Sequence, residues 1–218
     1  MVRALVCAGV ALVLGGFSGS GLQAQSVGSI GIDVGLFSPR STFHDGSYPG
    51  NTFESAIAYG ATGTFWFDRS YVGVRGRLLI TDVNGVNPNA PTAISENDPK
   101  ILLLSSQLAL RYPMEGASFN VSPYVAGGVG VKAYYWKRRS QAAYALAWPA
   151  SIGVEIQPNS FGSLSFNVEL SRIQSQFYFL GVERADPNDP NREGFYGGDI
   201  IGETNVDLMF AVGVAWTF

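Results

Sequence analysis

The sequence has few of the residues that carry common chemistries. It contains one cysteine, one histidine and 14 lysines and arginines in 218 residues. A structural metal site of cysteine and histidine takes about four such ligands, so this kind of site is excluded. The formal net charge of −3 disfavours nucleic-acid binding, which needs a basic surface. We therefore expect no metal, no cofactor and no nucleic-acid partner.

Charge of either sign is scarce. Asp, Glu, Lys and Arg make up 14% of the chain, against roughly 25% in ordinary soluble domains. Hydrophobic residues make up 46%, which is too much for a disordered chain. The length predicts one folded domain, or two at most.

The N-terminal segment has the three parts of a secretory signal peptide. Arg3 provides a basic start, residues 4–14 are continuously apolar, and a small and polar stretch leads to Ala24. The apolar run is shorter than the roughly 20 residues that a membrane-spanning helix needs. Residues 1–24 are therefore predicted to be removed on export. Residues 25–218 would then fold as one domain without cysteine, and so without disulfides.

Eight later segments alternate between large apolar residues and small or polar residues. A period of two is the spacing of a β-strand, and the clusters of Gly, Pro, Asn and Asp between the segments favour turns. In the last segment, large apolar residues recur at every second position from Leu208 to Phe218. The predicted strands are residues 29–37, 55–67, 71–82, 100–112, 121–136, 141–157, 163–171 and 205–218.

Eight charged residues in these segments lie on the face of the small residues. Four are acidic and four are basic, so their charges cancel: Asp33, Arg75, Arg77, Arg111, Lys132, Glu155, Glu169 and Asp207. A soluble sandwich or a lipocalin-like barrel would point its apolar face inward. A membrane barrel has an apolar outer face and a polar interior. Balanced charge favours the membrane barrel, because charges in a narrow lumen need partners.

The positions of these residues along the chain predict how they pair. Lys132 is expected to pair across the lumen with Glu155 and Glu169, which lie on the next two strands. Arg75 or Arg77 is expected to bind Asp33 or Asp207. The alternative, that these charges line a small ion path, is less favoured, since eight strands leave just enough interior space for side chains.

The connections between the predicted strands alternate in length. Short turns are expected at residues 68–70, 113–119 and 159–162, and long polar connections at 39–52, 83–99 and 181–203. Short periplasmic turns and longer outer loops are typical of outer-membrane barrels. Residues 137–140 are an exception, because they are short where a long connection is expected.

With its leader, its eight alternating segments and its C-terminal residues 210–218, the chain resembles the small eight-stranded outer-membrane barrels of the OmpA, OmpX and OmpW type. The resemblance implies an all-β, antiparallel, up-and-down transmembrane barrel, present as a monomer in the outer membrane of a Gram-negative-type bacterium. It also implies a C-terminal signal that the barrel assembly machinery reads. The residues of that signal are Phe210, Val212, Val214, Trp216 and Phe218.

Two further groups of residues indicate a membrane interface. Lys137, Arg138 and Arg139 follow three aromatic residues, so we expect these cations to contact lipopolysaccharide phosphates at the outer surface. At the periplasmic side an aromatic girdle is expected. Its predicted members are Phe65, Phe67, Tyr112, Trp216 and Phe218.

Arg172 and Gln174 depart from the pattern, because they fall in the lipid-facing phase. Either this stretch lies above the bilayer or a β-bulge resets the alternation. We prefer the first interpretation, since about 9–11 residues already span a membrane when a strand is tilted.

The fold leaves several functions open. The preferred hypothesis is a non-enzymatic role in envelope structure or in surface binding through the long loops. A narrow pore or a carrier of small apolar molecules is the alternative, and an interior cavity lined by small residues such as Gly128, Gly130 and Gly153 would favour it. A lipid-modifying enzyme would need His44, Asp45 and a serine in triad geometry, which adjacent loop residues rarely hold. No catalytic residue is assigned.

Overall fold

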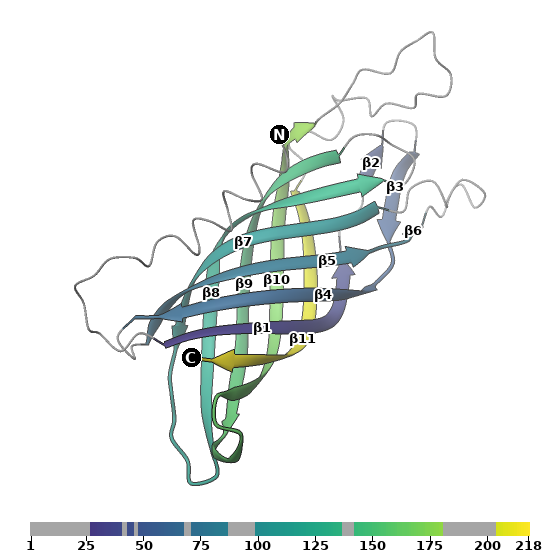
Figure 1. The fold of residues 1–218 in the computed structure, drawn as a ribbon. Coiled ribbons are helices and arrows are strands. Elements are labelled where there is room, and N and C mark those ends of the chain that lie inside the picture. The colour runs from purple at the N-terminus through teal and green to yellow at the C-terminus, as the bar shows by residue number, and fades with distance from the viewer. Residues whose placement is uncertain are drawn as a thin grey trace.

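The computed structural model describes residues 27–40, 43–45, 48–67, 71–86, 99–136, 142–180 and 204–218. Eight long strands form a closed barrel in which every neighbouring pair is antiparallel (Figure 1). They are β1 (Val27–Pro39), β4 (Ala56–Trp66), β5 (Val72–Asp82), β7 (Pro99–Arg111), β8 (Phe119–Trp136), β9 (Ala142–Pro158), β10 (Leu164–Leu180) and β11 (Thr204–Thr217). The predicted number, order and type of strands are confirmed. The predicted signal peptide, residues 1–24, lies outside the described residues.

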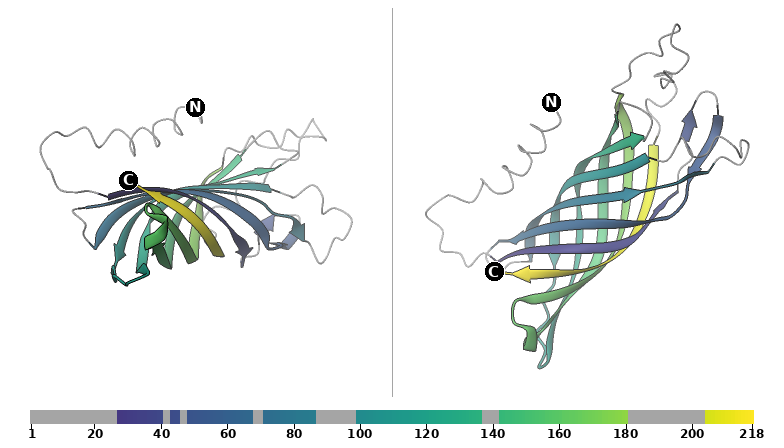
Figure 2. Two further views of the ribbon diagram at one scale, coloured as in Figure 1. Left: turned by 60° about the horizontal axis from the view of Figure 1, so that its bottom comes forward. Right: turned by 45° about the vertical axis from the view of Figure 1, so that its right-hand side comes forward.

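The strand register fixes the tilt of the barrel. Paired positions followed from Val27 through every strand lead back to β1 at Phe37, which is ten residues farther along that strand. A shift of this size in eight strands makes the strands tilt by roughly 35–45° to the barrel axis. Figure 2 shows this tilt. Because of this tilt, the residues that face each other across the lumen cannot be found by counting positions along the sequence alone.

The two ends of the barrel differ. At one end, which we call the turn end, three short connections join β4 to β5, β7 to β8 and β9 to β10, and both barrel termini lie there. The third connection contains a short 3-10 helix, η2 (Asn159–Phe161), followed by Gly162 at a φ of 59°, which glycine adopts without strain. None of the described residues forms a helix long and apolar enough to cross a membrane.

The opposite end, the loop end, carries a small second sheet that the sequence did not predict. It consists of β2 (Phe43–Asp45), β3 (Tyr48–Phe53) and β6 (Gly85–Val86). β3 pairs with β6, so the connection after β1 is joined by backbone pairing to the connection after β5. Both segments had been predicted only as long polar connections.

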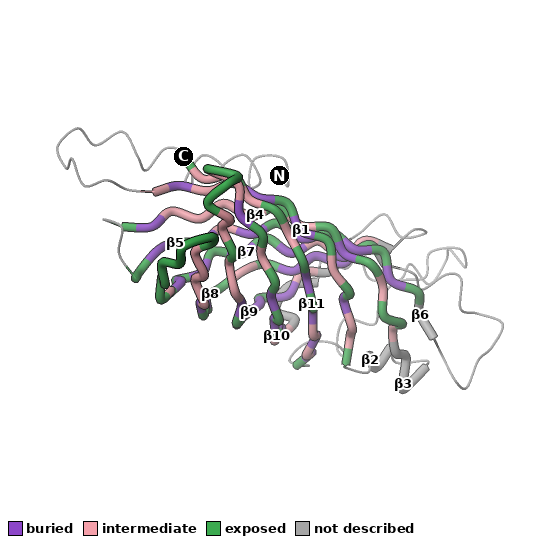
Figure 3. The backbone as a smooth tube through the Cα atoms, turned by 90° about the horizontal axis from the view of Figure 1, so that it is seen from below, coloured by how far each residue is buried: buried purple, intermediate pink, exposed green. Residues whose placement is uncertain are grey.

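The outward face of the barrel is a band of exposed apolar side chains. Buried and exposed residues alternate along the strands (Figure 3), with Ile32 71% exposed and its neighbour Asp33 6% exposed. Aromatic residues gather at the turn end, where Tyr71 stacks on Tyr112 with ring centroids 6.0 Å apart. Of the predicted girdle, Phe67, Tyr112, Trp216 and Phe218 are exposed and Phe65 is half-buried.

The predicted irregularity near Arg172 is settled by the register. β10 pairs with β11 without interruption from Leu164 to Gln176, and its pairing with β9 shifts only between Phe177 and Phe179. No bulge therefore resets the alternation at Arg172, which is exposed on the outward face.

Candidate functional site

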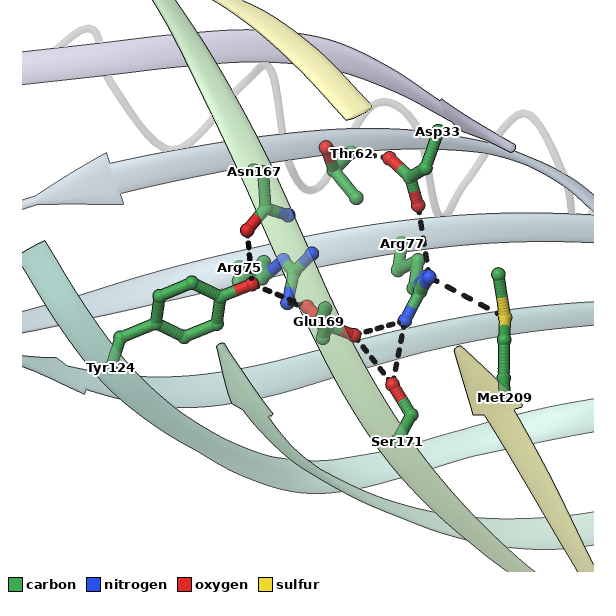
Figure 4. Close-up of polar contacts among 9 residues, drawn as sticks. All are labelled: Asp33, Thr62, Arg75, Arg77, Tyr124, Asn167, Glu169, Ser171 and Met209. Carbon is green, nitrogen blue, oxygen red and sulfur yellow. Dashed lines mark hydrogen bonds and ion pairs between the residues drawn. The ribbon is translucent and has the colours of Figure 1, made fainter. Parts of the chain in front are cut away.

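The half of the lumen nearer the turns, the turn-side half, contains an ionic cluster formed by Asp33, Arg75, Arg77 and Glu169 (Figure 4). Both arginines are inward-facing positions of β5, and Glu169 is an inward-facing position of β10, the strand opposite β5 in the closed order. Each Glu169 carboxylate oxygen accepts a hydrogen bond from one arginine. Arg77 also donates from Nη2 to Asp33 Oδ2 at 2.9 Å. The two pairs with Glu169 cross the diameter of the lumen, whereas the pair with Asp33 bridges β5 and β1 past the one strand between them, β4.

Neutral side chains complete the hydrogen bonding of Glu169. The Tyr124 hydroxyl lies 2.6 Å from Glu169 Oε2 and 2.8 Å from Asn167 Oδ1. Ser171 Oγ donates to Glu169 Oε1 and accepts from Arg77 Nη1 at 3.0 Å. The buried carboxylate thus has two cations and two hydroxyls around it, which offsets its loss of hydration.

A second ion pair joins Lys132 of β8 to Asp207 of β11 farther toward the loops. The Lys132 side chain is fully buried, and its Nζ lies 4.6 Å from the Tyr134 ring centroid and 5.5 Å from the Phe37 ring centroid. This pair lies among apolar side chains, which include the rings of Phe37 and Tyr134.

The predicted pairing is confirmed for one set of charges and wrong for another. Arg77 binds Asp33, as expected for that group. Lys132 binds Asp207 and not Glu155 or Glu169. The reason is the tilt, because Ile173 is the β10 residue paired with Asp207, and Glu169 lies four residues nearer the turns.

Arg111 and Glu155, the remaining predicted lumen charges, lie near the turn end. The Arg111 guanidinium carbon lies 4.1 Å from the Trp66 ring centroid, a cation–π contact. Glu155 is half-buried. Trp66 packs with Ala109 and Ala126 in a small buried cluster, which narrows the lumen at this end.

The half of the lumen nearer the loops, the loop-side half, is filled by apolar side chains that the sequence analysis did not identify. Leu79 and Leu103 have no more than 1% exposure, although they share the inward phase of Arg75 and Ser105. The signal was present in residues 101–104, an uninterrupted apolar run typical of a strand buried on both faces. The cluster consists of Phe37, Ala58, Leu79, Val83, Ile101, Leu103, Tyr134, Ala145, Ala147, Ile173, Met209 and Ala211.

The described part of the barrel contains a small cavity in its turn-side half. A cavity of about 40 Å³ lies between Asp33, Thr62, Arg75, Tyr124 and Asn167. Since a cavity holds a water molecule from roughly 10–15 Å³ upward, this space suits a few waters and no larger solute. The Tyr124 ring fills the space beside one of the small residues, because a Cβ added at Gly153 would lie 2.5 Å from that ring.

The predicted C-terminal signal lies on the outward face of the barrel. Its five residues are between 38% and 70% exposed. Phe218 exchanges two backbone hydrogen bonds with Gly28, at 2.9 and 3.1 Å. The Phe218 ring would lie 2.7 Å from a Cβ at Gly28, so a larger residue at that position would displace the ring.

Two groups of predicted residues are not placed by the structure. Lys137, Arg138 and Arg139 lie outside the described residues. His44 lies in β2, opposite Pro49, but Ser47 is not described, so the structure does not test the triad hypothesis that the sequence analysis disfavoured. Among the described residues, no group of three or more His, Cys, Asp or Glu side chains is placed to hold a metal ion.

Comparison with known proteins shows similarity at the level of fold. The sequence matches no protein-family model and no curated protein. Neisserial surface protein A is 9% identical, with a TM-score of 0.48 over 88% of this chain and 97% of that one. The Yersinia pestis attachment invasion locus protein Ail, solved with the heparin analogue sucrose octasulfate, is 10% identical, with a TM-score of 0.44 over 88% and 99%. The Escherichia coli outer-membrane protease OmpT is 9% identical, with a TM-score of 0.36 over 92% and 99%.

Proposed function

We propose that this chain is a monomeric outer-membrane barrel with a closed lumen, which holds its long connections at the cell surface for a structural or binding role without enzymatic activity. The single observation that carries this proposal is the filled interior. Ion pairs cross the turn-side half, and apolar side chains fill the loop-side half. A barrel filled in this way supports anchoring and presentation better than passage of solutes.

The outer face supports the location in a membrane. Residues such as Ile30, Ile32 and Ile152 are 60% or more exposed, and contiguous exposed apolar surface on this scale marks contact with lipid. In a membrane, every backbone polar group must be paired, and closure of the sheet satisfies this requirement. The expected partners are lipopolysaccharide and other outer-membrane lipids, and the barrel assembly machinery during biogenesis.

Conductance tests the closed lumen directly. Purified full-length protein inserted into planar bilayers is expected to give no steady ion current, because the buried pairs leave no continuous aqueous path. A triple variant, Arg75→Ala, Arg77→Ala and Glu169→Ala, removes the crossing side chains and serves as a matched comparison. Steady current through the wild-type barrel would contradict the scaffold proposal and favour the narrow pore.

Labelling tests the orientation. The sole cysteine, Cys7, lies in the predicted signal peptide, so single cysteines can be introduced without background from the mature chain. Ser160→Cys, in the exposed turn between β9 and β10, is expected to react with a membrane-impermeant maleimide only after the outer membrane is permeabilised. Asp189→Cys, in the longest connection, is expected to react on intact cells. The reverse pattern would show that the turns face outward.

A further inference from the structure

Arg172 has no partner of opposite charge in the described part of the chain. It is an exposed, outward-facing residue of β10, and its described polar contact is a hydrogen bond from Nη1 to Gln174 Oε1 at 3.2 Å. None of the ion pairs among the described residues includes it. By contrast, the exposed cation Lys100 has a partner, because its Nζ lies 3.8 Å from Asp82 Oδ1 where two neighbouring strands end.

The register places Arg172 within the apolar band. Its neighbours on either side are Ala150 of β9 and Leu208 of β11. On β9 the outward apolar residues continue toward the loops through Trp148 to Leu146, which pairs with Gln176 and is 39% exposed. The apolar surface therefore extends four residues beyond the level of Arg172 on the adjoining strand. The interpretation that this stretch lies above the bilayer is thus not required by the surface around it.

An arginine facing hydrocarbon without an anion costs free energy, and the long side chain relieves that cost by reaching headgroup phosphates. The guanidinium has five N–H donors in a fixed fork that matches two phosphate oxygens. One N–H is used by Gln174 Oε1, so Gln174 is oriented with its own NH₂ group available as a further donor. Arg172 and Gln174 together form an anion-binding surface at the edge of an apolar wall.

We propose that Arg172 and Gln174 bind the phosphate of a phosphorylated lipid in the outer leaflet, with its acyl chains along the wall below. The wall beside Arg172 has two small outward residues, Ala150 and Gly127. Ala150 is exposed, and the space beside Gly127 is open, because the nearest atom to a Cβ added there would be 3.9 Å away. Gly127 pairs with Ala150, and Ala150 pairs with Arg172, so these positions form one row across β8, β9 and β10. The site rests on the proposed membrane location of the barrel.

The test is native mass spectrometry of the full-length protein, purified from outer membranes, with defined probes. Wild-type protein is expected to bind diphosphoryl lipid A and not its dephosphorylated form. Arg172→Gln is expected to weaken that binding by about tenfold, and Arg172→Lys by less, because lysine gives a point charge without the fork. Lys100→Gln, which also removes one exposed cation, serves as the matched control and is expected to bind as wild type.

Four outcomes would overturn the proposal. These are equal binding by Arg172→Gln, equal binding of dephosphorylated lipid A, displacement by equimolar inorganic phosphate, and formation of a dimer that depends on Arg172. Displacement would indicate a site for free anions, and the dimer would indicate a carboxylate from a second copy. Each variant is first run on SDS gels with and without boiling. If boiling does not change the gel migration of the wild-type protein, the membrane barrel itself is contradicted. If the migration changes as expected but Arg172→Gln binds lipid A as wild type does, only the lipid site is contradicted.

Discussion

The turn-side and loop-side halves of the lumen have the same wall and different contents. In both halves, large apolar side chains face outward and the opposite phase is buried. Inside the turn-side half, two arginines bind Glu169 across the diameter, and one of them also binds Asp33. Inside the loop-side half, one ion pair, Lys132 with Asp207, lies among aliphatic and aromatic side chains.

The difference separates two tasks. Ion pairs have defined partners, so the turn-side half specifies which strands face each other across the barrel. Apolar packing has no defined partners and excludes water, so in the proposed closed barrel the loop-side half provides the seal. A strand such as β5 takes part in both, with Arg75 and Arg77 followed by Leu79 in the same inward phase.

The largest effect is expected from Glu169→Gln, which breaks the turn-side half. Two buried arginines would lose their shared carboxylate, and breaking a buried pair costs about 3–5 kcal/mol of unfolding free energy. Urea unfolding in lipid vesicles, followed by tryptophan fluorescence, measures this change. Combining the substitution with Arg75→Met and Arg77→Met is expected to recover part of the loss. A cost below about 1 kcal/mol would show that the cluster is solvated and does not hold the strands together.

A smaller loss is expected from Lys132→Met in the loop-side half. Asp207 would remain as a buried carboxylate without its cation, at a cost of about 3 kcal/mol. The double variant with Asp207→Leu should regain most of that stability, since most of the surrounding side chains are apolar. A more complete recovery of unfolding free energy here than in the turn-side half would show that the two halves depend on different interactions. Equal recovery in both halves would argue that their contents are interchangeable.

The sequence was sufficient to predict what depends on local alternation. The period of two predicted the eight strands, their inward and outward faces, and the charged residues inside, because side-chain direction in a strand follows position alone. The pairing of Lys132 was predicted wrongly because it depends on the ten-residue register shift, which arises only when β1 closes on β11. Nothing in the residues around Lys132 or Glu169 encodes that shift.

The loop-side packing was missed for a different reason. Residues 101–104 are apolar on both faces, so the inward direction of Ile101 and Leu103 is masked by the outward Leu102 and Leu104. The small sheet of β2, β3 and β6 was missed because glycine, proline and asparagine in these segments favour turns in isolation. Pairing between distant connections overrides that local preference.

The smallest effects come from two neighbouring inward positions of β7, one in each half. Leu103→Ala is expected to cost about 2–3 kcal/mol, because it leaves a cavity in closely packed apolar surroundings. Ser105→Ala, two residues nearer the turns, is expected to change stability by less than about 1 kcal/mol, because the buried Ser105 hydroxyl has no hydrogen-bond partner in the described structure. The same vesicle-based unfolding assay applies to both. The two side chains lie on one strand and point the same way, so their losses of stability can be compared directly. A larger loss for Ser105→Ala than for Leu103→Ala would mean that apolar packing in the loop-side half contributes less to stability than the polar surroundings of Ser105. The assignment of the seal to the loop-side half would then be wrong.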